Sequence, residues 1–406
     1  MDCLFSAVEM LNQPVQVGQL KLKNRIGMSA MSRNRSPSSY PGNLNQEYYY
    51  QRALGGCGFL TSEGALVCPQ GTPMPNAPQL DSREHMLAWK KIVDKVHTVP
   101  GSIFFCQIWH AGRLTNEHAK MQKKAGTSPQ APSAIRARNG FKHGAKFTVF
   151  EDVVSSKEGG YSVPEAIKDV HAVVEQHRRS AQWAKEAGFD GVELHAANGY
   201  LVSQFLCATA NQRTDLYGGS VENRTRFPLE VIDSMIDIWG PGRVGIKLSP
   251  GGGLGDVGMA REEQIAQYEY LITELDKRPL AYILLVRYLR FMDMEIDGQM
   301  RGINHPVWAT YRHLIKNAKV FLNGNISVPE AEELLKDGTG DVIVFGRPWI
   351  TNPDFANKVF SGMECIFNYD FVTFSSYPPD RPEKGYTDYP FTTVDYEHAE
   401  IERPKL

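Results

Sequence analysis

Three side chains with hydrogen-bonding groups stand close together at residues 195–200, which read His-Ala-Ala-Asn-Gly-Tyr. An imidazole N–H of His195 and the amide NH2 of Asn198 can converge on one oxygen, which would polarise a carbonyl or hold an oxyanion. Tyr200 adds a hydroxyl with an ordinary pKa of about 10, suited to protonating a carbanion-like centre. Two plainer interpretations stay open, a buried core histidine and a tyrosine that packs at the rim of the fold. Zinc is disfavoured because no second His or Cys stands at a usual ligand spacing.

A second group of residues suggests an anion site. Asn323-Gly324-Asn325 leads into an expected helix at Val328-Pro329, and Gly346-Arg347 follows the next apolar run. Backbone N–H groups at such turns and at a helix N-terminus bind phosphate, and the guanidinium of Arg347 adds a forked donor. The alternative is a pair of tight turns and a surface arginine.

Both groups lie at the ends of predicted strands. Eight compact apolar runs are typical of strands covered on both faces, and they are Arg25–Ala30, Phe59–Val67, Ile103–Trp109, Gly191–Ala196, Val244–Ser249, Tyr282–Val286, Val320–Asn323 and Val342–Phe345. Helical patterns alternate with them, at Ser82–Val96, Pro164–Ala187, Arg224–Trp239, Arg261–Asp276, Pro329–Asp337 and Pro353–Val359. Ser82 is expected to be an N-cap, and Gly188 to end the longest helix. This alternation predicts an α/β fold, a (β/α)8 TIM barrel, with an open doubly wound sheet as the alternative.

Two segments interrupt the pattern. Residues 111–161, rich in Gly, Pro, Lys and Ser, are expected to form an insertion after the third strand, with a hairpin or lid near Phe147–Val154. Residues 368–406, rich in Tyr, Pro and Asp, are expected to form an irregular tail on the surface. We expect one barrel domain over residues 1–406, with its active site at the C-terminal ends of the strands.

Composition excludes several classes of protein. The formal net charge of -2 over 406 residues gives no reason to expect binding to nucleic acid or to an anionic membrane. We see no secretory signal and no apolar run near the roughly 18 residues that span a bilayer. The six cysteines are scattered and are expected to be free thiols in the cytoplasm.

Three long motifs carry a family resemblance. Residues 107–113 read Gln-Ile-Trp-His-Ala-Gly-Arg, residues 195–206 read His-Ala-Ala-Asn-Gly-Tyr-Leu-Val-Ser-Gln-Phe-Leu, and residues 211–224 read Asn-Gln-Arg-Thr-Asp-Leu-Tyr-Gly-Gly-Ser-Val-Glu-Asn-Arg. Shorter matches are Lys247–Pro250, Gly346–Pro348 and Gly385–Pro390. From about Leu4 to Pro390 the chain resembles the Old Yellow Enzyme family of FMN-dependent, NAD(P)H-oxidising ene-reductases.

The resemblance implies roles for matching positions. Ser32 would hydrogen-bond the flavin, Gly64 and Gln107 would line its pyrimidine edge, and Lys247 would lie near N1 and O2. Asn323, Gly324, Asn325, Gly346 and Arg347 would form the phosphate site. His195 and Asn198 would hold the substrate oxygen, Tyr200 would donate the proton, and Trp109 would shape the substrate pocket.

The implied reaction has two halves. NADPH or NADH reduces FMN, and hydride then passes from flavin N5 to Cβ of an α,β-unsaturated aldehyde or ketone while Tyr200 protonates Cα. The small activated alkene would be the only partner, bound by a monomer or homodimer. The resemblance does not fix the substrate.

Several positions depart from the family pattern. Lys247 stands where the family commonly has Arg, which keeps the cation but loses the fork. Ser375 replaces a pocket tyrosine, and Arg287-Tyr288-Leu289-Arg290 replaces a more acidic stretch that contains proline. A redox-neutral enone isomerase, a barrel lyase or isomerase without flavin, and a binding or scaffold protein are the alternative functions.

Overall fold

A closed ring of parallel strands with eight strand positions, one of them shared by two short strands, forms the centre of the molecule. The computed structural model describes residues 8–138 and 160–392. The strands are β3 (Ile26–Met28), β4 (Phe59–Thr61) with β5 (Ala65–Leu66), β6 (Phe104–Trp109), β9 (Gly191–Ala196), β10 (Val244–Leu248), β11 (Tyr282–Val286), β14 (Lys319–Asn323) and β15 (Val342–Phe345). Each is parallel to its neighbours, and β15 pairs back onto β3, so the sheet closes. The predicted TIM barrel is confirmed, and the open sheet is wrong.

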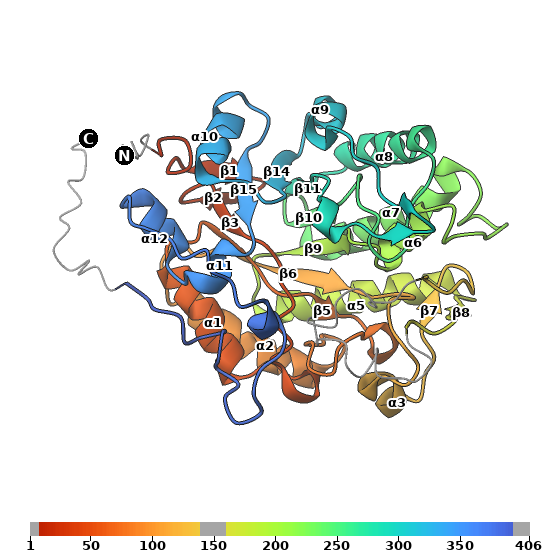
Figure 1. Ribbon diagram of the computed structural model, residues 1–406, viewed down its shortest axis with the longest axis horizontal. Helices are drawn as coiled ribbons and strands as arrows, with labels where there is room; N and C mark the ends of the chain where they lie inside the picture. Colours follow the sequence, from red (N-terminus) through yellow and green to blue (C-terminus); the bar gives the residue numbers. More distant parts are fainter. Residues whose placement is uncertain (1–7, 139–159, 393–406) are drawn as a thin grey trace.

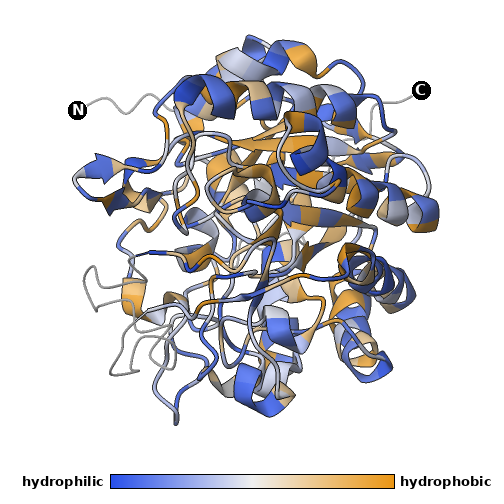
Figure 2. Cartoon of the chain, turned by 90° about the vertical axis from the view of Figure 1, so that its right-hand side faces the viewer, coloured by the Kyte–Doolittle hydropathy of each residue, from blue (hydrophilic) through white to orange (hydrophobic). Residues whose placement is uncertain are grey.

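Aromatic side chains fill the barrel interior on the side away from the C-terminal ends of the strands. Phe59, Phe105, Tyr282 and Phe321 pack together there, with the rings of Tyr282 and Phe321 stacked 4.1 Å apart. An antiparallel hairpin of β1 (Val15–Val17) and β2 (Leu20–Leu22) belongs to the same apolar cluster. This packing closes one end of the barrel, which leaves the strand C-termini as the open end. Figure 2 shows the hydrophobic residues concentrated on the central strands.

Helices surround the barrel (Figure 1). They are α1 (Asn43–Leu54), α2 (Arg83–Val96), α3 (Lys120–Ala125), α5 (Val170–Ala187), α6 (Leu201–Leu206), α7 (Val221–Trp239), α8 (Arg261–Asp276), α9 (Val307–Tyr311), α10 (Val328–Lys336), α11 (Pro348–Thr351) and α12 (Phe355–Phe360). The predicted cap at Ser82 is confirmed, since its hydroxyl accepts from the backbone N–H of His85. Gly188 ends α5 in the left-handed conformation, as expected.

The longest predicted helix starts later than expected. We expected it from Pro164, but α5 begins at Val170, after the N-cap Asp169. The preceding residues Glu165–Ala166 form the short strand β8, which pairs with β7 (Gln130–Ala131). The carboxylate of Asp169 accepts from the N–H of Ala172 at 3.0 Å. Pairing with β7 and this cap together fix the start of the helix.

Asp169→Ala is expected to lower the free energy of unfolding by about 1 kcal/mol, because α5 loses its side-chain cap. Urea unfolding followed by circular dichroism measures the change. Asp169→Asn keeps an acceptor oxygen and should stay close to the wild type. Equal destabilisation by both variants would contradict the capping role.

The second predicted strand is also corrected. We expected one strand over Phe59–Val67, but residues 62–64 separate β4 from β5. The backbone N–H of Glu63 donates to the hydroxyl of Tyr49 at 2.7 Å, outside the strand ladder. A Cβ on Gly64 would lie 2.7 Å from the ring of Trp109. The break therefore lets the chain pass close to Trp109.

The C-terminal tail is irregular, but it is not only a surface feature as we expected. Tyr386 is fully buried, and its ring stacks on Tyr48 at 4.2 Å. Arg33 donates to the carbonyls of Phe374 and Gly385, and Arg35 donates to that of Thr373. Two guanidinium groups thus bind the tail to the loop after β3.

The expected hairpin at Phe147–Val154 lies outside the described residues. Two further short strands, β12 (Glu295–Ile296) and β13 (Gln299–Met300), form a hairpin in the loop after β11. Within residues 8–138 and 160–392, no helix is both long enough and apolar enough to cross a bilayer.

Candidate active site

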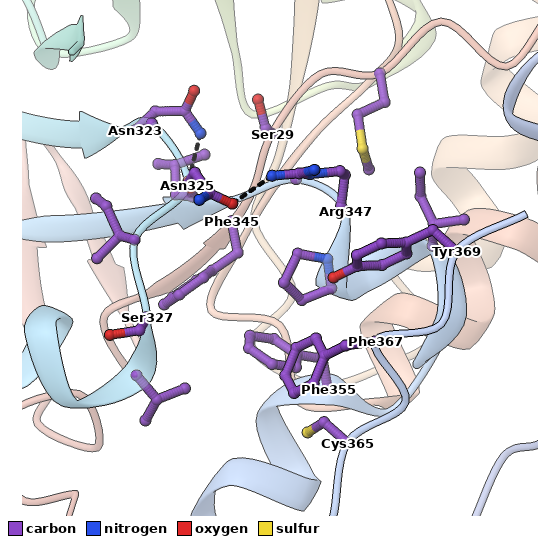
Figure 3. A pocket seen from close by; sticks show the side chains of 18 of the residues that line it. Ser29, Asn323, Asn325, Ser327, Phe345, Arg347, Phe355, Cys365, Phe367 and Tyr369 are labelled. Carbon is purple, nitrogen blue, oxygen red and sulfur yellow. Dashed lines mark hydrogen bonds between the residues drawn. The ribbon is translucent and has the colours of Figure 1, made fainter. Parts of the chain in front are cut away.

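A cavity of about 880 Å³ opens at the C-terminal ends of the strands. Eight of the predicted site residues line it, namely Ser32, Asn198, Lys247, Asn323, Gly324, Asn325, Gly346 and Arg347. Lys247 and Arg347 both line the cavity, so its wall carries two basic side chains. Figure 3 shows the part of the cavity around Arg347, where Tyr369 lies beside the guanidinium and Phe367 and Phe355 lie below it in this view.

The loop after β9 presents His195 and Asn198. His195 is the fifth residue of β9, and its Nδ1 accepts from the backbone N–H of Ala197 at 3.4 Å. Burial, together with the nearby charge of Lys247, holds the pKa of His195 well below its usual range. The ring is therefore neutral at physiological pH, and its proton lies on Nε2, where it can be donated.

Asn198 occupies a turn that few residue types accept. Its φ is 59°, in the left-handed region, and its N–H donates to the hydroxyl of Ser249 at 2.9 Å. The next residue, Gly199, also has positive φ, and a Cβ there would lie 1.8 Å from the carbonyl oxygen of Leu254. These constraints hold the turn between the ends of β9 and β10.

Tyr200 closes a group of three rings. Its ring lies 4.9 Å from His195 and 4.9 Å from Trp109, edge to face with both. Burial raises the pKa of Tyr200 to about 12, so its hydroxyl keeps its proton at neutral pH. The indole N–H of Trp109 is buried and has no hydrogen-bond partner among the described residues.

Polar side chains from neighbouring strands surround Lys247 and Gln107. Lys247 donates from Nζ to the hydroxyl of Ser29 at 3.0 Å. Burial lowers the pKa of Lys247, and the charge of Glu193 opposes that shift. Gln107 donates from Nε2 to a carboxylate oxygen of Glu193 at 2.7 Å. A cation and an amide are thus held on adjacent parts of the barrel interior.

The loops after β14 and β15 meet as the sequence predicts. The guanidinium of Arg347 donates to the side-chain oxygen of Asn325 and lies over the rings of Phe291 and Tyr369, at 5.1 and 5.6 Å. Gly324 has a φ of 139°, and a Cβ there would lie 2.5 Å from the Arg287 side chain. The turn at Gly324 therefore depends on glycine.

Arg287 contributes to this turn in a way that the sequence did not indicate. It donates to the carbonyls of Gly324 and Asn325 and pairs with Glu330 in the first turn of α10. It therefore engages backbone oxygens, which leaves the N–H groups of the turn for a ligand.

The site residues fall into two groups. Gly64, Gln107, Trp109, His195 and Tyr200 do not line the large cavity. Gly64, Trp109, His195 and Tyr200 contact one another in turn, and Gln107 binds Glu193. Sequence reasoning missed Ser29 and Glu193. For Glu193 a signal existed, because a carboxylate inside an otherwise apolar strand, two residues before His195, must lie on the same face. Of the residues that depart from the family pattern, Ser375 is buried and binds Asn34 only through its backbone oxygen.

Comparison with known proteins identifies the family of the chain. Residues 10–365 match the model of the NADH:flavin oxidoreductase / NADH oxidase family. The chain is 34% identical over 390 residues to aldehyde reductase FrzD of a Cladobotryum species, with 95% of each chain covered. It is also 34% identical over 381 residues to 12-oxophytodienoate reductase 2 of Arabidopsis thaliana, covering 93% of this chain and 94% of the relative.

Solved structures agree with the sequence matches. Morphinone reductase in complex with tetrahydroNAD superimposes with a TM-score of 0.80 at 36% identity, covering 96% of this chain and 99% of the other. The old yellow enzyme homologue from Zymomonas mobilis also gives 0.80, at 30% identity, covering 94% and 99%. The alternative function, a barrel lyase or isomerase without flavin, is therefore wrong. The chain belongs to the Old Yellow Enzyme family and is an NAD(P)H-dependent flavin oxidoreductase.

Proposed function

We propose that this enzyme is an ene-reductase that binds FMN and reduces the C=C bond of α,β-unsaturated aldehydes or ketones, with NADPH or NADH as reductant. The observation that carries the proposal is the contact between the rings of His195 and Tyr200, with Asn198 of the same loop lining a cavity that also holds Lys247 and Arg347. Two neutral donors and one proton source match the needs of an enone, in which negative charge grows on oxygen while Cα gains a proton.

The residues of the cavity fit FMN. Lys247 supplies a cation for the electron-rich pyrimidine edge, and the turns at Gly324 and Gly346 with Arg347 supply donors for a phosphate. Ser32 also lines the cavity, while Gly64 lies beside Trp109 and Gln107 beside Glu193. When bound there, FMN would supply the hydride chemistry, which no protein side chain provides.

His195 and Asn198 would bind the carbonyl oxygen of the substrate. The neutral imidazole donates from Nε2 and so adds a hydrogen bond without a titrating charge. These donors stabilise the oxygen more strongly as it becomes negative, which is how a binding contact accelerates a reaction. The indole ring of Trp109, beside Tyr200, would restrict the orientations in which the substrate can bind.

Tyr200 would give its hydroxyl proton to Cα of the substrate. Its pKa of about 12 keeps the group protonated across the physiological range. Within residues 8–138 and 160–392, no carboxylate or lysine forms a hydrogen bond with its hydroxyl, and its ring packs against the rings of Trp109 and His195. It thus differs from an activated nucleophile and suits a general acid.

Stopped-flow absorbance on the purified holoenzyme tests the proposed function. NADPH or NADH should bleach the flavin band, and 2-cyclohexenone or an unsaturated aldehyde should then restore it with formation of the saturated product. A protein that binds no FMN, or whose reduced flavin no activated alkene reoxidises, would refute the proposal. Conversion of the enone without consumption of NAD(P)H would instead indicate a redox-neutral isomerase.

Arg347→Met is expected to weaken FMN binding by about 10- to 100-fold, the effect of losing a charge-assisted hydrogen bond to phosphate. Titration of the apoprotein with FMN, followed by quenching of flavin fluorescence, measures the dissociation constant. Arg347→Lys keeps the charge without the fork and should give a smaller loss. Riboflavin, which has no phosphate, should bind the wild type and Arg347→Met equally, and unchanged FMN affinity would contradict the assignment.

We also propose a reducing compartment, the cytosol, and a monomer or homodimer as the working form. The five cysteines in the described part of the chain are free thiols, four of them buried. Cys3 lies outside the described residues.

A further inference from the structure

Glu193 is a carboxylate buried in the barrel that the proposed reaction does not use. It is 1% exposed and stands on β9 two residues before His195, so both side chains project into the barrel interior. In the sheet it lies opposite Gln107 of β6 and Gly245 of β10. Lys247 follows Gly245 by two residues and so lies on the same interior face, one step toward the open end of the barrel.

The contacts of Glu193 fix which way the Gln107 amide points. One carboxylate oxygen accepts from Nε2 of Gln107 at 2.7 Å, and the other accepts from the hydroxyl of Tyr282 at 2.9 Å. A carboxylate only accepts hydrogen bonds, so the NH2 group of Gln107 must face it. Rotating the amide by half a turn would bring two oxygens together. Among the described residues, none donates to the amide oxygen of Gln107.

Glu193 also acts on Lys247 through its charge. Burial raises the pKa of Glu193, and the charge of Lys247 opposes that shift. The only hydrogen bond from Lys247 to a described residue goes to Ser29. The two opposite charges therefore interact across the barrel interior, where electrostatic effects are stronger than in water.

We propose that Glu193 is a positioning residue for the flavin, which keeps the Gln107 amide oxygen available to the pyrimidine N3–H of FMN and opposes the charge of Lys247. This inference rests on the proposed function, in which FMN binds in this cavity. Its first consequence is tighter FMN binding, because Gln107 is held in the accepting orientation. Its second is a lower midpoint potential, because a negative charge disfavours the added electrons.

Glu193→Gln tests both consequences, because the amide has the same shape but no longer dictates the orientation of Gln107. FMN titration of the apoprotein should give a dissociation constant about tenfold higher, the scale of one lost charged hydrogen bond. Tyr282→Phe is the matched control, since it removes the other partner of Glu193 and should change the affinity less than twofold.

A double-mutant cycle shows whether Glu193 acts through Gln107. In a Gln107→Leu background, Glu193→Gln should change FMN affinity less than twofold, because the group that it orients is gone. Equal effects in both backgrounds would overturn the inference. Failure of the wild-type protein to bind FMN would refute the proposed function instead, and so the two failures are distinguishable.

The midpoint potential separates a positioning role from a structural one. Dye-coupled reduction of the holoenzyme should give a more positive potential for Glu193→Gln than for the wild type. An unchanged or more negative potential, or a lower melting temperature of the apoprotein as the only effect, would overturn the inference. Should Glu193→Gln not fold, Glu193→Asp keeps the charge but moves the carboxylate away from Gln107. We then expect weaker FMN binding at a nearly unchanged midpoint potential. Unchanged FMN binding by Glu193→Asp would overturn the inference.

Discussion

Tyr200→Phe should slow reduction of the alkene by about 10²- to 10⁴-fold, the range for loss of a general acid. Reduction of the flavin by NADPH should stay within about twofold of the wild type, because that half-reaction needs no proton at Cα. The variant removes one oxygen atom and keeps the ring, so the contacts with His195 and Trp109 at 4.9 Å are preserved. Stopped-flow absorbance measures each half-reaction separately.

Tyr217→Phe is the matched control for this substitution. Its hydroxyl donates to a carboxylate oxygen of Glu230 at 3.0 Å and contacts neither His195 nor Trp109, so both half-reactions should be unchanged. Solvent deuterium should slow reoxidation of the wild-type flavin by the alkene and should lose this effect in Tyr200→Phe. Equal loss in both half-reactions would contradict the role of Tyr200 as proton donor.

The strands and their C-terminal residues were predictable because buried strands have a strong sequence signal. Runs such as 282–286 and 342–345 are continuously apolar, and both strands have the predicted bounds. His195 and Arg347 are polar residues directly after or within such runs, and so the barrel rule alone directs attention to them. Closure of the sheet could also be predicted, since eight strands allow it.

Other features depend on contacts between distant segments, which no local pattern contains. The start of α5 at Val170 depends on pairing between β7 and β8, and Pro164 gave a competing local signal. The buried position of Tyr386 depends on Tyr48 and on two arginines more than 300 residues away. Likewise, Arg287 could be noticed as an unusual residue, but its bonds to Gly324 and Asn325 required the folded chain.

His195→Ala combined with Asn198→Ala should abolish tight binding of phenols, because a phenolate oxygen resembles the enolate oxygen that this pair would hold. Loss of one such donor lowers kcat by about 10²- to 10³-fold in comparable sites, so the rate of alkene reduction should fall by at least this factor. Phenol binding is measured from the long-wavelength absorbance that appears when a phenolate stacks on the oxidised flavin.

The two single variants show whether both side chains bind the same oxygen. If they do, either substitution weakens phenol binding, and the two effects combine non-additively because the remaining donor can shift toward the oxygen. Since the pKa of His195 is held well below its usual range, the imidazole stays neutral between pH 6 and 8, about the range in which a free histidine titrates. Phenol affinity should therefore show no step near pH 6.5 once ionisation of the phenol is accounted for. A step that disappears in His195→Ala would mean that His195 binds as a cation, and unchanged affinity in the double variant would remove the pair from the site altogether.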